Sequence, residues 1–268
     1  MNITDRIARC AVILMAWAGL VFLTLPLVII IATSFTETQF LAFPPVGFTF
    51  KWYGEFLRDT SYLESIWTSV AIAALATVLA ISIGILAALV VSRSEIRGKR
   101  IISTVFIAPL ILPTIVIGAA LLQYANALGF ARSFFALVIG HTVIVVPYVL
   151  RTVLASLQRF DRSLEEASHD LGGTSVSTFF LITLPIIKPG VVAGALFAFI
   201  ISWINVELSI FNATAEVMPI PVKLFNYVQY AVDPMLAAVS ATTIYVAIIA
   251  VIILDVFVGL DRVAASQK

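Results

Sequence analysis

Residues 165–190 read EEASHDLGGTSVSTFFLITLPIIKPG, a segment that begins with acidic residues and contains a Gly-Gly pair. Long runs of Val, Ile, Leu and Phe stand on both sides of it. This polar segment needs a different environment from the apolar runs beside it, because ionisable side chains are rarely placed in contact with lipid. Its local structure and its surroundings together indicate what the protein does.

The overall composition is that of a membrane protein. Of the 268 residues, 61% are hydrophobic and 12% are charged, and the mean hydropathy is +1.09. A soluble domain has about 25% charged residues, and a helix needs about 20 apolar residues to cross a bilayer. Six runs reach that length, so we expect an all-α, polytopic protein with six transmembrane helices, at residues 10–33, 66–92, 101–123, 134–155, 186–210 and 237–260.

The orientation follows from the basic residues. The first apolar run is too long for the hydrophobic region of a signal peptide and lacks a clear cleavage site, so we expect an uncleaved helix. If the N-terminus is inside, twelve of the 16 Lys and Arg residues fall on inner segments and four on outer ones. Because cationic loops stay on the cytoplasmic side, both termini are expected in the cytoplasm.

Proline and glycine mark special positions inside the expected spans. Pro109 and Pro113 fall in the third span and Pro147 in the fourth. Proline removes a backbone hydrogen bond and kinks a helix, although transmembrane helices tolerate it well. In the fifth span, Gly190 and Gly194 are four residues apart, a spacing that lets another helix approach closely. We therefore expect kinks at the prolines, unless they are merely tolerated, and packing at the glycines.

The polar segment itself predicts two short helices. Ser163 followed by Glu166 is the pattern of a capping box, which predicts a helix from about Leu164. Gly172 and Gly173 predict its end, because glycine adopts the left-handed conformation that closes helices. Leu164, Ala167 and Leu171 would share one face of this helix. A second short helix would be capped by Ser175 and ended by Pro185. We call residues 163–185 the knob.

Three interpretations of the knob differ in their partner. A nucleic-acid-binding helix-turn-helix needs a basic second helix, but the second helix here reads Phe-Phe-Leu-Ile, which argues against nucleic acid. A solvated loop without a partner does not explain why two capped helices stand where short turns serve elsewhere in the chain. A docking element for a cytoplasmic partner explains the capping, the amphipathic pattern and the position together.

The knob also resembles a known motif. Glu166-Ala167-Ser168, three residues, Gly172, nine residues and Ile182-Thr183-Leu184-Pro185 is similar to the EAA loop (E-A-A-x3-G-x9-I-x-L-P) of the inner-membrane permeases of binding-protein-dependent ABC importers. The one departure is Ser168 in place of the second alanine. Beyond the loop, the resemblance extends over roughly residues 62–260, to the second permease of the polyamine (spermidine/putrescine) branch.

The resemblance implies a permease subunit of a type I ABC importer in the bacterial inner membrane. Such a subunit pairs with a second permease, binds two ATPase subunits and receives solute from a periplasmic solute-binding protein. We expect residues 1–61 to form an N-terminal transmembrane helix and an outer loop, residues 62–260 the transmembrane core, and residues 261–268 a cytoplasmic tail. The solute would be a polyamine or a related small organic compound, although opines, aminophosphonates and metal chelates stay open.

The resemblance carries the coupling role to particular positions. Glu166, Ala167 and Gly172 match the motif and would insert into the ATPase subunit. We include their neighbours in the expected ATPase-coupling set, which is Glu165, Glu166, Ala167, Ser168, Asp170, Gly172 and Gly173.

No catalytic site is visible in the sequence. Gly98-Lys99 is followed by Arg100 and lacks the preceding glycine of a P-loop, and neither histidine belongs to an H-E-x-x-H motif. We therefore expect no enzyme activity and no bound cofactor or metal in this chain, with ATP and magnesium on the partner subunit. Cys10 is the only cysteine, so no intrachain disulfide can form.

The expected solute pathway rests on Trp203, Asn205 and Glu207, near the outer end of the fifth span. Trp203 and Glu207 are four apart and would share a helix face, where a carboxylate beside an aromatic ring suits a cationic amine. The alternative is that Glu207 lies at the interface and meets water or a loop lysine. His141 and Asp255 are expected to form hydrogen bonds between helices.

A different class of protein is also consistent with the apolar composition. A secondary transporter or a channel would work without an ATPase. Secondary transporters often carry internal repeats, and none is apparent here. The absence of repeats and the EAA-like loop favour the importer.

Overall fold

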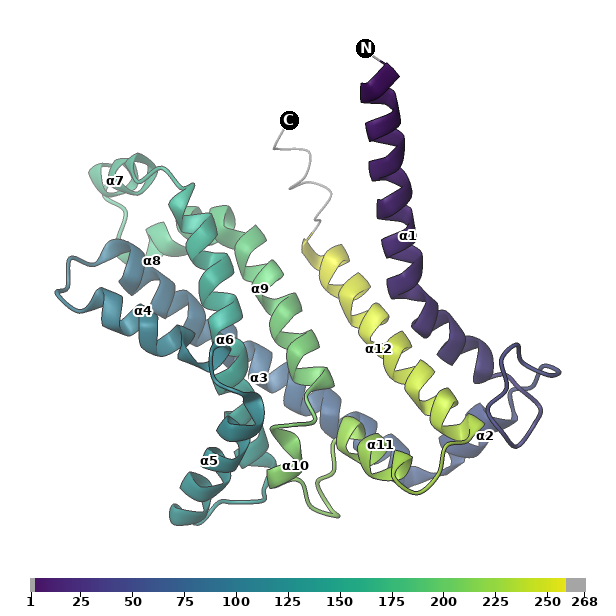
Figure 1. Ribbon diagram of the computed structural model, residues 1–268. Coiled ribbons are helices and arrows are strands. Elements are labelled where there is room, and N and C mark those ends of the chain that lie inside the picture. The colour runs from purple at the N-terminus through teal and green to yellow at the C-terminus, as the bar shows by residue number, and fades with distance from the viewer. Residues whose placement is uncertain (1–2, 259–268) are drawn as a thin grey trace. The chain divides into compact units, whose positions relative to one another are not determined.

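The computed structural model describes the backbone of residues 3–258 and the side chains of residues 9–253 (Figure 1). Within these residues the chain is built of helices and contains no strand. Five helices are long and apolar enough to cross a membrane, and a bent pair of helices brings the number of spans to as many as six. The expected all-α, polytopic fold is confirmed, and the sixth span depends on how the bent pair is counted.

The chain divides into two compact units. Met1–Leu63 groups with Asn226–Val246, and Glu64–Phe225 groups with Ala247–Lys268. We call them the N-terminal unit and the core unit. The N-terminal unit contains α1 (Ile3–Thr33), α2 (Lys51–Arg58) and the first part of α12 (Pro234–Val258).

The N-terminal unit is organised around aromatic side chains. The rings of Phe35 and Phe48 stack with their centroids 4.8 Å apart, and Phe50 contacts both edge-on. Trp52 in α2 donates from Nε1 to the carbonyl of Thr36 at 2.8 Å. Burial raises the pKa of Tyr53 to about 12, against a smaller opposing effect of its hydrogen bond to Ser34.

Three long helices make the core unit: α3 (Thr60–Arg93), which begins in the N-terminal unit, α6 (Phe134–Gln158) and α9 (Leu184–Ile204). Helices α6 and α9 lie side by side (Figure 1). A Cβ at Gly194 would lie 2.8 Å from the Cα of Val149, and one at Gly190 would lie 2.6 Å from the carbonyl oxygen of Thr152. No larger residue fits at these distances, so the packing role expected for the glycine pair is confirmed.

The third span is broken rather than merely kinked. Helix α4 (Lys99–Ile107) and the short η1 (Ala108–Leu110) are followed by α5 (Thr114–Ala127), at an angle of 105°. Pro109 stands at the start of η1, and Pro113 is the N-cap residue of α5. A single proline bends a helix by removing one backbone donor. Two prolines within five residues remove two donors from adjacent turns, so the helix breaks here. By contrast, α6 continues through Pro147.

The fifth span differs from expectation at its outer end. We expected one helix over residues 186–210, but α9 ends at Ile204, and α10 (Ser209–Asn212) follows after a turn. Asn205 is extended, with ψ at 106°, and its side-chain Oδ1 accepts a hydrogen bond from the backbone N–H of Leu208 at 2.9 Å. Because a side-chain acceptor competes with the helical backbone pattern, the helix ends at Asn205.

The fifth span also begins earlier than expected. Pro185 was expected to end a separate second helix of the knob, but the chain stays helical from α8 (Ser175–Thr178) through the π-helical η2 (Phe179–Thr183) into α9. Proline lacks the N–H for an ordinary helical bond and crowds the carbonyl four residues earlier. A π turn shifts the bonding to the fifth residue, so the helix passes Pro185 without ending.

Candidate functional site

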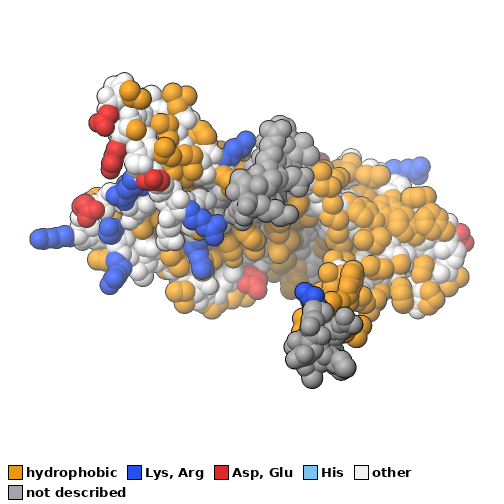
Figure 2. Space-filling model, turned by 90° about the horizontal axis from the view of Figure 1, so that it is seen from above, with side chains coloured by type: hydrophobic (Ala, Val, Ile, Leu, Met, Phe, Trp, Pro, Cys, Tyr) orange, Lys and Arg blue, Asp and Glu red, His pale blue; other side chains and the backbone are white. Residues whose placement is uncertain are grey.

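The knob lies at the end of the core unit where α3 ends and α4 begins (Figure 1). Its first helix is α7 (Ser163–Asp170), and α8 and η2 follow. Figure 2 shows that acidic and basic side chains gather at this end of the molecule.

The N-cap residue of α7 is Arg162, whose side chain makes no capping hydrogen bond, and the residue before it, Asp161, bonds the first helical N–H instead. Asp161 Oδ1 accepts from the backbone N–H of Ser163 at 3.0 Å, and Ser163 is itself the first helical residue. The expected capping box between Ser163 and Glu166 is therefore wrong. The carboxylate of Asp161 takes the place of the hydroxyl because it accepts more strongly and also favours the positive end of the helix. Hydrogen bonds from Ser163 lower the pKa of Asp161.

The C-terminus of α7 is closed by the glycine pair, as expected. Gly172 has a φ of +85°, in the left-handed region. Its N–H donates to the carbonyl of His169 at 2.9 Å, and the N–H of Gly173 donates to that of Ser168 at 2.8 Å. These two bonds are the Schellman motif, which satisfies the last carbonyls of a helix. The turn is thus a fixed corner.

The second helix of the knob is held against the first. Its N-cap residue is Thr174, whose hydroxyl accepts from the N–H of Ser177 at 3.2 Å, so the expected cap at Ser175 is one residue too late. The hydroxyls of Ser168 and Thr178 lie 2.8 Å apart. Ser168 therefore faces the interior of the knob, and Gly173 packs against it.

Glu165 also faces inward. Its Oε1 accepts from Arg93 Nη2 at 3.1 Å and from Thr183 Oγ1 at 2.6 Å. The guanidinium of Arg93 lies over the ring of Phe160, 4.9 Å from its centroid. Glu165 thereby joins α7 to the end of α3 and to η2.

The other residues of the coupling set face outward. Glu166, Ala167, Asp170 and Gly172 are exposed. Beside them, Leu171 is 90% exposed, and Leu164 and Val176 are exposed as well. The expected apolar face of α7 exists, but no described part of this chain covers it. The coupling set therefore divides into an inward group that holds the knob together and an outward group that presents a surface.

The expected solute-pathway residues do not form one face. Trp203 is 3% exposed and stacks on Phe199, with centroids 6.2 Å apart. Glu207 is exposed on the turn after α9, so it does not share a helix face with Trp203, as we had expected. Asn205 shapes that turn through its bond to Leu208. Glu207 is therefore an exposed carboxylate on a turn, whereas Trp203 is buried within α9.

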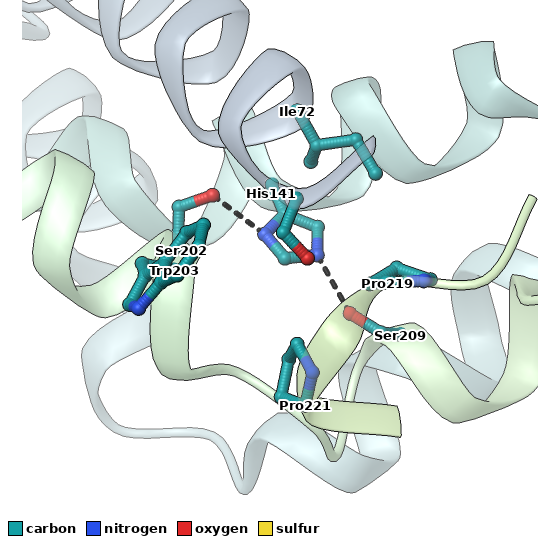
Figure 3. A pocket seen from close by; sticks show the side chains of 8 residues that line it. Ile72, His141, Ser202, Trp203, Ser209, Pro219 and Pro221 are labelled. Carbon is teal, nitrogen blue, oxygen red and sulfur yellow. Dashed lines mark hydrogen bonds between the residues drawn. The ribbon is translucent and has the colours of Figure 1, made fainter. Parts of the chain in front are cut away.

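A buried polar network lies behind this turn (Figure 3). His141 Nδ1 lies 2.7 Å from Ser202 Oγ, and Nε2 lies 2.9 Å from Ser209 Oγ. Because Ser209 donates to the carbonyl of Asn205 at 2.8 Å, its oxygen must accept from Nε2–H. Ser202 then donates to Nδ1. The expected hydrogen bonds between helices are confirmed for His141, whereas the side chain of Asp255 lies outside the described residues.

The network offers little to a solute. Apolar residues line the space around His141, notably Ile72, Trp203, Pro219 and Pro221 (Figure 3). Both ring nitrogens are engaged, so the network fixes the ends of α9 and α10 against α6. The sequence analysis found His141 but not its serine partners, because serines carry no local pattern that marks them. Among the described residues, no group of three or more His, Cys, Asp or Glu residues is placed to hold a metal ion.

Comparison with known proteins shows the class to which this fold and this site belong. The chain belongs to the family of binding-protein-dependent transport system inner membrane components, whose model matches residues 80–262. It is 32% identical over 229 residues to the putrescine transport system permease protein PotI of Escherichia coli K12, covering 83% of this chain and 81% of that one. It is 30% identical over 232 residues to the spermidine/putrescine transport system permease protein PotC of Haemophilus influenzae, covering 87% and 90%.

Solved structures show the same fold. A chain of a bacterial ABC transporter involved in the import of the acidic polysaccharide alginate matches with a TM-score of 0.76 and 17% identity, covering 95% of this chain and 98% of that one. A structure of bacterial alginate ABC transporter in complex with an alginate pentasaccharide-bound periplasmic protein matches with a TM-score of 0.71 and 14% identity, covering 94% and 93%. This chain is therefore a multi-pass permease component of an ABC transporter, as the resemblance implied.

Proposed function

We propose that the chain forms half of the translocation pathway of an ATP-driven importer that moves a polyamine or a related small organic cation from periplasm to cytoplasm. The observation that carries this proposal is the outward surface of α7, which exposes apolar and acidic side chains on a fixed scaffold. The named relatives, which are putrescine and spermidine/putrescine permeases over most of the chain, support the solute class.

The outward surface of α7 is the docking surface for an ATPase subunit. An exposed apolar residue such as Leu171 is stabilised when a partner removes it from water. Glu166 and Asp170 add charges that choose the partner and its orientation. Gly172 lies at the corner, where no atom stands within 4 Å of an added Cβ, so a side chain there would project toward the partner.

The complete transporter contains further subunits. A second permease covers part of the apolar surface of this chain, two ATPase subunits bind ATP and magnesium, and a periplasmic solute-binding protein delivers the solute. Membrane lipid surrounds the assembly in the bacterial inner membrane, with both termini of this chain in the cytoplasm. The many exposed apolar side chains of α1, such as Phe22, suit lipid or another permease.

The solute meets this chain at Glu207. Its carboxylate is exposed and stands on a turn that Asn205 and the His141 network hold in place. A fixed carboxylate attracts an ammonium group through charge without needing Trp203. Whether the solute contacts other residues depends on the second permease.

The test is reconstitution. The chain is purified with its candidate ATPase, second permease and binding protein, placed in liposomes, and supplied with radiolabelled putrescine. Uptake should require ATP and the binding protein. A chain that moves putrescine alone and without ATP would instead be a secondary transporter or a channel.

A matched pair of glycine variants tests the docking surface. Gly172→Asp should abolish uptake and reduce co-purification of the ATPase. Gly129→Asp is the control, because Gly129 also has a positive φ, +79°, and also has no atom within 4 Å of an added Cβ. Both variants carry a similar backbone strain. Equal loss of uptake in the two variants would remove the support for docking at Gly172.

A further inference from the structure

Two arginines join the end of α3 to the segment that begins the knob. One arginine lies on α3 and bonds α7, and the other lies directly before α7 and bonds α3. Arg93, the last residue of α3, places Nη2 3.1 Å from Glu165 Oε1 in α7. Arg162, directly before α7, donates from Nη2 to the carbonyl of Ser92 in the last turn of α3. The residues of the ion pair are 72 positions apart in the sequence. Segments distant along the chain are thus tied twice.

Glu165 adds a third segment to this junction. The same oxygen, Oε1, accepts the hydroxyl of Thr183 in η2 at 2.6 Å. Thr183 is buried, so its hydroxyl has few other partners to choose from. One carboxylate oxygen therefore holds α3, α7 and the helix that leads into α9.

The surroundings make this ion pair stronger than an ordinary surface pair. The side chains of Arg93 and Glu165 are 20% and 21% exposed, and the ring of Phe160 covers the guanidinium. The pair of Lys51 and Glu55 shows the contrast, with a separation of 3.7 Å and exposures of 54% and 43%. Removing one partner of a shielded pair leaves a poorly solvated charge, whereas exposed pairs contribute little.

Arg93 also has a donor in reserve. Its Nε is buried and has no hydrogen-bond partner among the described residues. The guanidinium holds several N–H donors in a rigid fork that matches a carboxylate. A small rotation of the Arg93 guanidinium can therefore bring Nε as well as Nη2 to the carboxylate of Glu165. The ion pair can thus persist while the helices shift.

We propose that Arg93 and Glu165 are positioning residues that make α3 move together with α7 when the ATPase displaces the knob. The backbone joins the knob directly to α6 and α9, but α3 has no such connection to it. The side-chain bonds supply that connection, and the Arg93–Glu165 pair is the one that joins α3 to α7 and η2 at once. This inference rests on the proposed function of α7 as the ATPase-docking helix.

A distance measurement tests the link directly. Spin labels are placed at His169 in α7, which is not among the residues assigned to docking, and at Glu95 just after α3, both exposed, in the assembled transporter in nanodiscs. Double electron–electron resonance then gives their separation without nucleotide and with ATP and vanadate. With the pair intact, the separation should stay the same in both states. In Glu165→Gln, which keeps an acceptor for Thr183 but removes the charge, ATP and vanadate should change or broaden it. An unchanged distribution would overturn the proposal.

The ratio of ATP hydrolysed to putrescine transported provides a second readout. A merely structural defect lowers hydrolysis and uptake together, whereas a lost link leaves hydrolysis running without transport. We expect Glu165→Gln and Arg93→Gln each to raise the ratio roughly fivefold or more, the lower end of the range for coupled sites. The charge reversal Arg93→Glu with Glu165→Arg should restore it in part, and Glu55→Gln should leave it unchanged. A ratio unaffected by all substitutions at the pair would contradict the link.

Failure of docking and failure of the link give different results. If α7 does not dock, the variant Ala167→Cys with Arg93 and Glu165 intact will not crosslink to the ATPase. If docking is right and the link is wrong, the crosslink forms while Glu165→Gln keeps a normal ratio and normal distances. In the first case both proposals fail, and in the second the proposal on Arg93 and Glu165 fails while the docking proposal stands.

Discussion

The hydroxyl of Ser168 lies 2.8 Å from the hydroxyl of Thr178, inside the knob. Ser168 stands where the EAA motif has its second alanine, and its contact joins α7 to α8. A residue that faces the interior has no direct contact with a docked partner. The serine therefore fits the packing of this particular knob, and in the proposed docking the outward residues of α7 would select the ATPase.

The first prediction concerns this contact. Ser168→Ala should weaken the attachment of α8 to α7 by about 1 kcal/mol, the usual net value of a hydrogen bond. Hydrogen exchange measured by mass spectrometry should become faster across residues 163–178, while co-purification of the ATPase stays unchanged. Thr178→Ala should have the same effect, and the double variant should be no worse than either single one. Additive effects would mean that the two hydroxyls act independently.

The second prediction concerns charge on the docking surface. Glu166→Lys should leave the protein in the membrane but abolish ATP-driven putrescine uptake, because a reversed charge opposes the partner surface. Glu64→Lys, an exposed acidic residue at the start of α3, is the matched control and should retain uptake. Membrane abundance is checked by immunoblotting. Full uptake in Glu166→Lys would count against the docking role of α7.

The third prediction concerns the His141 network. His141→Ala removes two hydrogen bonds and leaves Ser202 without its acceptor, at a cost of about 1–3 kcal/mol for an unsatisfied buried group. The midpoint of thermal unfolding in detergent should fall. His169→Ala should have a much smaller effect, because His169 is exposed and bonds only the carbonyl of Gly173 through Nδ1. Equal shifts in the two variants would contradict the role assigned to His141.

The fourth prediction concerns pH. Because hydrogen bonds from Ser163 lower the pKa of Asp161 below its ordinary value, ionised Asp161 stabilises the N-terminus of α7. This stability is present above the ordinary pKa and is lost as the pH falls through the lowered pKa. The protection of the amides of residues 163–166, which is their exchange rate corrected for the intrinsic rate at each pH, should therefore fall over that acidic range. In Asp161→Asn the protection should lack this dependence. Identical pH profiles would show that ionised Asp161 does not stabilise the start of α7.

The fifth prediction concerns the contact of α6 with α9. Gly194→Leu should prevent assembly of the core unit, because even a Cβ would lie 2.8 Å from the Cα of Val149. Gly19→Leu is the control, since no atom lies within 4 Å of a Cβ added to Gly19 in α1. Size-exclusion chromatography of fluorescent fusions measures the outcome. A monodisperse Gly194→Leu protein would show that the helices can separate without loss of the fold.

The sequence predicted those features that depend on local pattern. The apolar runs predicted the helices, and Gly172 predicted the end of α7. The start of α7 was harder to predict, because Asp161 and Ser163 can each accept a backbone N–H and only the folded chain shows that Asp161 does so. The end of α9 at Asn205 was missed because apolar residues continue on both sides of it. The role of Glu165 had no local signal, since its partner Arg93 is 72 residues away.

The continuity of the helix from Ser175 to Ile204 has a mechanical consequence. Its 30 residues span about 45 Å at 1.5 Å per residue, enough to reach across a bilayer. If the helix from Ser175 ended at Pro185, a flexible connection to α9 would separate the movement of the knob from that of α9. In the proposed transporter, this continuous helix would carry a displacement of α8 at one end to the turn at the other end that carries Glu207.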